Sequence, residues 1–238
     1  MISLTRPAGI HLTSLALMSL FLVIGFGGPL VGCESTMKTL STPPSVKLQQ
    51  DGDHEFKWGR YESAAAFYRT ILDREPGNPE ALEMYGRCML KLDRPAEAED
   101  VFLAVTAHRP GDRTLLFLLA QAEFAAGDYD HSFQLVRMWA IDNEDAEAWL
   151  LLAGFAMELD DPDNARDAIE RAIELDSTGS AAAYLAAADL AERLGDTDLA
   201  LRRLRQAYGI EVENDVIAER LREYGEIPGP TVVLPPGV

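Results

Sequence analysis

The sequence has 238 residues, of which 47% are hydrophobic and 25% are charged. This composition excludes a wholly disordered chain and predicts one folded domain. The formal net charge of −18 repels phosphate backbones and therefore argues against nucleic acid as a partner.

Residues 1–32 have the features of a signal peptide. Arg6 supplies a positive charge, and the apolar run Leu12–Ile24 is shorter than the roughly 20 residues of a membrane-spanning helix. Glycines and Pro29 then precede a Leu-Val-Gly-Cys sequence that ends at Cys33 and resembles a bacterial lipobox. The resemblance implies that Cys33 is lipidated and becomes the mature N-terminus. An uncleaved membrane anchor and an ordinary secretory signal are the alternatives.

The lipobox resemblance also implies a location in the bacterial cell envelope, lipid-anchored and facing the periplasm. Glu34 follows the cysteine; because Asp at that place retains such lipoproteins in the inner membrane, Glu34 favours the outer membrane. Residues 33–44 lack periodicity and are predicted to be a flexible tether. With Cys33 lipidated, Cys88 has no disulfide partner, and we expect it to be a buried thiol.

A pattern of about 34 residues repeats between residues 45 and 214. Gly59, Gly127 and Gly195 are each 68 residues apart, and Asp93 and Asp160 lie near the midpoints. Residues of these types end helices, so each repeat is predicted to contain two helices with a stop between them.

Small and large side chains recur in register with the stops. Small residues follow each stop, at Ala64, Ala98, Ser132, Ala165 and Ala200. Large apolar residues come next, at Tyr68, Phe102, Val136, Ile169 and Leu204. The helix before each stop carries Leu48, Leu82, Leu116, Trp149 and Tyr184, and then the small residues Gly52, Gly86, Ala120, Ala153 and Ala188. Small residues let two antiparallel helices approach closely, and large ones fill the space between hairpins.

This frame resembles the W-x2-L-G-x2-Y…A-x3-F…P pattern of the tetratricopeptide repeat (TPR) family. The resemblance implies an all-α, right-handed superhelical solenoid of about five TPR helical hairpins, with an unrelated all-α bundle as the alternative. The predicted repeats are approximately 45–78, 79–112, 113–145, 146–180 and 181–214. Residues 215–225 are predicted to form a C-terminal capping helix, and the proline-rich tail 226–238 is predicted to be disordered or extended.

In this family the first helices of successive repeats line a concave groove. The resemblance implies that the partner-binding groove contains Phe56, Leu90, Phe117, Phe124, Leu150, Met157 and Leu185. Polar residues expected beside them are Gln49, Asp53, Glu80, Glu83, Arg87, Gln121, Glu147 and Asp189. Such a groove suits an extended peptide or an amphipathic helix, and its acidic rim would steer a basic partner. Packing of these apolar residues against the adjacent repeat is the alternative.

The family's clamp for C-terminal carboxylates needs Lys and Asn in the groove. The matching places here hold Gln49, Asp53, Met84, Thr114 and Leu118. The resemblance therefore implies that a carboxylate-terminated or acidic ligand is disfavoured.

Candidate chemical sites have simpler structural explanations. His54 and Glu55 do not share one face of a helix, and the acidic run 160–164 lacks the glycine and distal glutamate of a calcium loop. The basic residues Arg202, Arg203 and Arg205 are expected to pair with nearby acids, with anionic lipid as the alternative. We therefore expect no catalytic residues, no metal and no cofactor.

Together these features predict a membrane-anchored protein–protein interaction scaffold or adaptor in an envelope assembly, with a pilus or secretion system as the leading setting. One alternative is an outer-membrane protein-assembly or cell-wall-coordination subunit. Another is a structural module that self-associates.

Overall fold

A computed structural model describes residues 43–176 and 179–237. The predicted signal peptide, Cys33 and most of the predicted tether lie outside these residues.

The described residues form eleven α-helices and no strand. The first helices of the five hairpins, called A helices below, are α1 (Ser45–Lys57), α3 (Pro79–Lys91), α5 (Arg113–Ala126), α7 (Ala146–Glu158) and α9 (Ala182–Arg193). The second helices, called B helices, are α2 (Tyr61–Leu72), α4 (Pro95–His108), α6 (Tyr129–Asn143), α8 (Pro162–Leu175) and α10 (Thr197–Ile210). A shorter helix, α11 (Asp215–Glu223), follows the fifth hairpin. None of the helices described is long and apolar enough to span a membrane.

The five predicted helix stops all adopt the left-handed backbone conformation. The φ angles are 72° at Gly59, 57° at Asp93, 93° at Gly127, 56° at Asp160 and 75° at Gly195. Glycine adopts this conformation without strain, and aspartate tolerates it better than most residues do. The repeat spacing in the sequence therefore located the turn inside every hairpin.

Side-chain caps begin most of the A helices. Asn78, Asp112 and Asp145 accept hydrogen bonds from backbone N–H groups in the first turns of α3, α5 and α7. Such caps satisfy amides that have no partner inside the helix. The polar residues before these helices thus fix where each new repeat begins.

Each hairpin is closed by a small residue on its A helix and a large residue on its B helix. In the second hairpin a Cβ atom added to Gly86 would lie 2.7 Å from the ring of Phe102, and one added to Gly52 in the first would lie 2.9 Å from Tyr68. In the fourth hairpin Ala153 stands with the smaller Ile169, and both are buried. The B-helix residue is therefore larger where the A-helix residue is smaller, and this compensation keeps the core filled.

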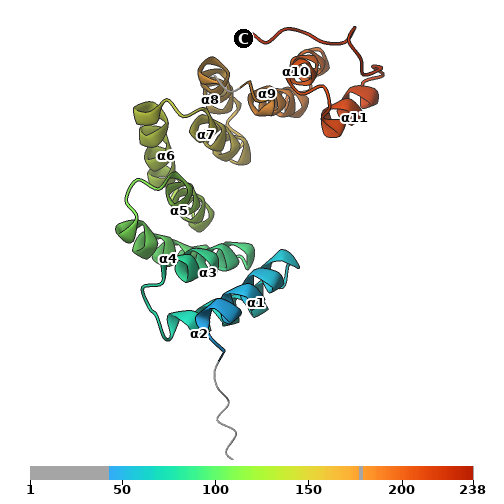
Figure 1. The fold of residues 1–238 in the computed structure, drawn as a ribbon. Helices are drawn as coiled ribbons and strands as arrows, with labels where there is room; N and C mark the ends of the chain where they lie inside the picture. Colours follow the sequence, from blue (N-terminus) through green and yellow to red (C-terminus); the bar gives the residue numbers. More distant parts are fainter. Residues whose placement is uncertain (1–42, 177–178, 238) are drawn as a thin grey trace, which may run out of the picture. The chain divides into compact units, whose positions relative to one another are not determined.

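The hairpins stack in chain order. Each B helix packs on the A helix of the next hairpin, and α7 also contacts the A helices α5 and α9. Figure 1 shows α5, α7 and α9 on the inner side of the curved stack, with α6, α8 and α10 on its outer side. The interior therefore runs as consecutive apolar clusters from α1 to α11.

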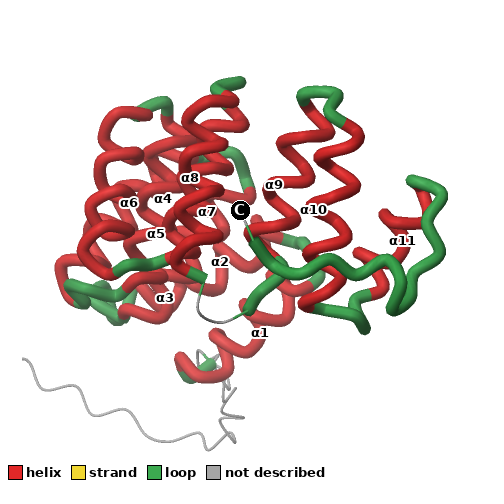
Figure 2. Tube along the Cα trace, turned by 90° about the horizontal axis from the view of Figure 1, so that it is seen from above, coloured by secondary structure: helices red, strands yellow, loops and turns green. Residues whose placement is uncertain are grey.

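Of the two states predicted for the tail, disordered or extended, the structure shows the extended one for residues 226–237, and this segment is packed against the stack. Val232 is buried in the apolar cluster of α9, α10 and α11. The backbone N–H of Leu234 donates to the carbonyl of Arg205 at 3.3 Å, and Glu226 pairs with the Arg205 guanidinium. Figure 2 shows this loop running back past α10 towards α9. Arg203 and Arg205 of α10 thus bind the chain's own tail, which the composition of the tail did not reveal.

Candidate partner-binding surface

The seven apolar residues predicted to line a groove all lie on A helices. We call the side of these helices that carries them the A-helix face. Six of them are half-buried, namely Phe56, Leu90, Phe117, Leu150, Met157 and Leu185, and all of these except Leu150 pack partly against the core. Each leaves part of its side chain at the surface, so their role in binding stays a prediction.

Phe124 differs from the other six because it belongs to the core. Only 8% of Phe124 is exposed, and its ring stacks on that of Phe155 at a centroid distance of 4.2 Å. The ring of Tyr129 lies 5.0 Å away on another side. This corrects the prediction that Phe124 lines an open groove, since the last turn of α5 directs the ring into the aromatic contacts with α6 and α7.

Arg113 organises the charges at the beginning of α5 and α7. Its guanidinium lies 3.3 Å from Asp145 and 2.8 Å from Glu147, and it stands over the ring of Phe117 at 5.6 Å. Asp145 also accepts a hydrogen bond from the indole of Trp139 at 3.0 Å. Burial would raise the pKa of Asp145, but this hydrogen bond, the capped amides and Arg113 together lower it.

Two other acids of the predicted rim are also paired. Glu83 contacts Arg87 at 3.0 Å and Arg109 at 3.3 Å. Asp189 contacts Arg220, which reaches it from α11 at 2.7 Å. Arginines of the stack thus offset part of the negative charge that the sequence placed on this face. Any preference for basic partners must therefore come from the net charge of −18 more than from a continuous acidic rim.

One hollow opens beside the A-helix face at α7. It encloses about 250 Å³ and is bordered by Arg113, Glu147, Leu150, Ala182 and Ala183. Two of these, Glu147 and Leu150, belong to the predicted groove set. The hollow therefore joins an apolar wall to charged groups of both signs, a combination that can hold and orient a peptide side chain.

A buried acid lies near the end of α5, beside the turn inside the third hairpin. Glu123 is 1% exposed; one carboxylate oxygen lies 2.8 Å from Nδ1 of His131, and the other has no hydrogen-bond partner. Burial raises the pKa of Glu123, and the charges of Glu99 and Asp128 add to this rise, while His131 opposes it. Glu123 could not be recognised from the sequence, because a glutamate in a helix gives no sign of its burial.

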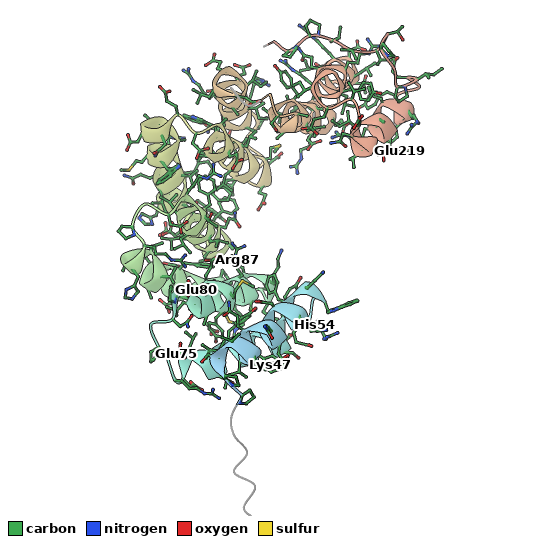
Figure 3. The ribbon with its side chains drawn as sticks, viewed as in Figure 1. Lys47, His54, Glu75, Glu80, Arg87 and Glu219 are labelled. Atoms are coloured by element: carbon green, nitrogen blue, oxygen red, sulfur yellow. The ribbon has the colours of Figure 1, made fainter. Side chains whose placement is uncertain are left out.

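The described residues contain no cluster of acidic, histidine and cysteine side chains that could hold a metal. His54 and Lys47 both come from α1, as Figure 3 shows, and His54 makes a ring contact with Trp58 instead. Cys88 is fully buried, and burial raises its thiol pKa to about 12. The thiol therefore stays protonated and serves as an apolar core side chain.

A second surface, which was not predicted from the sequence, lies on the outer side of the stack. Met138 is 56% exposed and Ile141 is 60% exposed on α6, where they line a hollow of about 470 Å³ with Tyr129, Phe133 and Leu159. The matching positions of the fourth repeat hold Arg171 and Glu174. Large apolar residues at positions that are charged in the next repeat were therefore a detectable indication of this surface.

Three family models, each described as a tetratricopeptide repeat, match residues 56–115, 89–146 and 146–178. Together these matches extend over more than half of the 238 residues. The chain therefore belongs to the tetratricopeptide repeat family. Members of this family are generally scaffolds that bind other proteins and are not enzymes.

Solved structures have the same fold. A tetratricopeptide repeat protein from Parabacteroides merdae has a TM-score of 0.61 at 20% identity, over 78% of this chain and 73% of its own. The thermophilic TPR protein TTC0263 from Thermus thermophilus has a TM-score of 0.57 at 20% identity, over 76% of this chain and 98% of its own. MamA from Desulfovibrio magneticus RS-1 has a TM-score of 0.54 at 17% identity, over 72% and 97%. No protein of curated function matches the chain.

Proposed function

We propose that this protein is an envelope adaptor that is held at a membrane by lipid on Cys33 and binds a partner protein along its A-helix face. The lipobox-like sequence that ends at Cys33 supports the anchor. Removal of residues 1–32 would delete Arg6 and no acid, so the mature chain would carry −19. We infer from this charge that the partner segment is apolar or basic.

The observation that carries the binding proposal is the hollow beside Leu150. It is an opening next to the A-helix face where a half-buried apolar side chain meets charged groups of both signs. An amphipathic helix or an extended peptide could place one apolar residue on Leu150 and a polar group on Arg113 or Glu147. The rest of the face would then add contacts along the stack.

In-cell photo-crosslinking tests this proposal. A photoreactive amino acid at Leu150 should form a discrete adduct with a partner protein, identified by mass spectrometry. The matched control carries the same amino acid at Leu103, which is 46% exposed on the B helix α4. No adduct from Leu150, or the same adduct from both positions, would contradict binding at the A-helix face.

A separate experiment tests the anchor. Cys33→Ser should leave an unlipidated precursor and remove stable membrane association, because a diacylglyceryl group needs the thiol. Retention of the variant in the membrane fraction after cleavage of the apolar segment would exclude the lipid anchor. Failure of this test would leave the Leu150 result unaffected.

We propose that the assembly served is a pilus or secretion system, facing the periplasm and preferentially at the outer membrane. Genes for such a system next to the gene for this chain would favour that setting. Their absence would favour an outer-membrane protein-assembly or cell-wall-coordination role. A monomer in sedimentation at high concentration would argue against a self-associating module.

A further inference from the structure

The C-terminal tail shows how the outer side of the stack holds an extended segment. The side-chain amide of Gln206 donates to the carbonyls of Pro235 at 3.2 Å and Gly237 at 3.0 Å. Arg203 also donates to the carbonyl of Gly237 at 3.0 Å, and the N–H of Gly237 donates to the hydroxyl of Tyr184 at 2.9 Å. Three side chains from α9 and α10 therefore bind the tail mainly through its backbone.

This arrangement suits a proline-containing segment. Proline has no N–H group, so such a segment mainly presents carbonyl acceptors, and Arg203 and Gln206 supply the donors. Gly209 allows the backbone to approach, because a Cβ atom there would lie 2.8 Å from the carbonyl oxygen of Leu234. The tail-binding site thus recognises an extended backbone more than particular side chains.

The preceding repeat has a hollow at the matching positions, with other residue types and with no occupant among the described residues. The residues 35 positions before the three tail-binding residues are Trp149, Ala168 and Arg171. All three line one hollow of about 280 Å³, together with Phe133 and Arg137. We call it the α6–α8 hollow. The repeat register and the geometry therefore agree that this hollow corresponds to the place where the tail ends.

The α6–α8 hollow has the lining that extended proline-rich segments use. Trp149 and Phe133 offer aromatic surface, and the guanidinium groups of Arg137 and Arg171 offer donors. Arg137 forms no ion pair within the described part of the chain. A second hollow of about 320 Å³ also borders Trp149 and Arg171 and includes the exposed Ile141. Aromatic grooves with nearby donors bind polyproline-type segments because these segments lose little conformational freedom on binding.

We propose that the α6–α8 hollow binds an extended, proline-containing segment of a partner protein. Arg171 takes the place of Gln206 and donates to the carbonyls of the segment, while Trp149 takes the place of Tyr184 and contacts its proline rings. Glu174 stands where the tail site has Gly209 and pairs with Arg171 at 3.0 Å, so an acidic segment is disfavoured. The proposal depends neither on the membrane anchor nor on the A-helix face.

Fluorescence anisotropy with a defined probe tests this proposal. The probe is a labelled synthetic peptide with the sequence of residues 227–238, and the protein is the mature chain with Cys33→Ser. A second peptide has every proline replaced by alanine. Arg171→Glu removes the proposed donor. Arg166→Glu is the matched control, because Arg166 is also exposed on α8 and also pairs with an acid three residues away.

We expect saturable binding of the probe, weakened about tenfold by Arg171→Glu and changed less than about twofold by Arg166→Glu. The alanine peptide should bind about tenfold more weakly. The probe could also bind by replacing the chain's own tail in the tail-binding site. Gly209→Ala obstructs that site alone, so it detects this exchange. The proposal is overturned if the probe does not reach saturation up to about 1 mM, or if Arg171→Glu and Arg166→Glu change its affinity equally. It is also overturned if the alanine peptide binds as tightly as the probe, or if Gly209→Ala abolishes binding of the probe.

Discussion

The contact between Gly86 and Phe102 allows a quantitative test of how the hairpins are built. In an exposed helix, Gly→Ala stabilises by about 1 kcal/mol, because alanine loses less backbone entropy on folding. At position 86 the new Cβ would lie 2.7 Å from the Phe102 ring, and both residues are buried. Overpacking of a core costs about 1–3 kcal/mol. We therefore expect Gly86→Ala to lower the free energy of unfolding by about 1 kcal/mol, despite its better helix propensity.

Gly154 provides the matched control, since it lies inside α7 and an added Cβ would meet no atom within 4 Å. Gly154→Ala should raise the free energy of unfolding by up to about 1 kcal/mol. Phe102→Ile should rescue Gly86→Ala, because it recreates the Ala153–Ile169 pair of the fourth hairpin. The free energy of unfolding of the double variant should therefore exceed the value expected from adding the two single effects by about 1 kcal/mol or more.

Urea unfolding followed by circular dichroism measures all of these variants, provided that the slope of the transition stays constant. Equal stabilisation by Gly86→Ala and Gly154→Ala would contradict the expected clash with Phe102. Additive effects of Gly86→Ala and Phe102→Ile would contradict it as well. Either result would mean that the hairpin relaxes enough to accept the extra atom.

Three further predictions concern buried or capping side chains. The pKa of Glu123 is higher in the folded state than in the unfolded state, so the contribution of Glu123 to the free energy of unfolding falls as the pH rises from the unfolded-state pKa through the folded-state pKa. Glu123→Gln should therefore flatten the pH dependence of the urea midpoint between pH 4 and 8. An unchanged pH dependence in this variant would contradict the prediction. Asp145→Ala removes the cap of α7 and the partner of the Trp139 indole, so it should lower the free energy of unfolding by about 2 kcal/mol, whereas Asp145→Asn should retain most of the cap. Phe124→Glu places a carboxylate in the aromatic stack and should unfold the third and fourth hairpins; full helicity by circular dichroism would show that the site opens to solvent.

The hairpins could be predicted from the sequence because their determinants are local and repeated. The glycines and aspartates at positions 59, 93, 127, 160 and 195 set each turn through backbone conformation, which depends on the residue itself. One copy of this pattern would be a weak indication, but five copies in register are a strong one. The family comparison confirmed the tetratricopeptide repeats. The capping residue Asp145 was likewise open to recognition, since a cap acts on its own helix.

The surface was less predictable, because exposure depends on neighbours that are distant in the sequence. Phe124 occupies a position expected to face the groove, yet the aromatic rings of α6 and α7 enclose it. Glu83 and Asp189 were expected to form an acidic rim, but arginines from other elements pair with them. Periodicity states which face of a helix a residue occupies and does not state what covers that face.

The sequence by itself determined the class of this protein: the number of hairpins, the place of each turn, and the small-with-large pairing inside each hairpin. Only the tertiary structure decided what is open and what is covered. The tail shows the reason. Its composition favours disorder, but Val232 is buried in an apolar cluster and side chains of α10 donate hydrogen bonds to the tail's carbonyl groups. Those contacts join residues about 30 positions apart, so packing created the site that the chain's own tail now occupies.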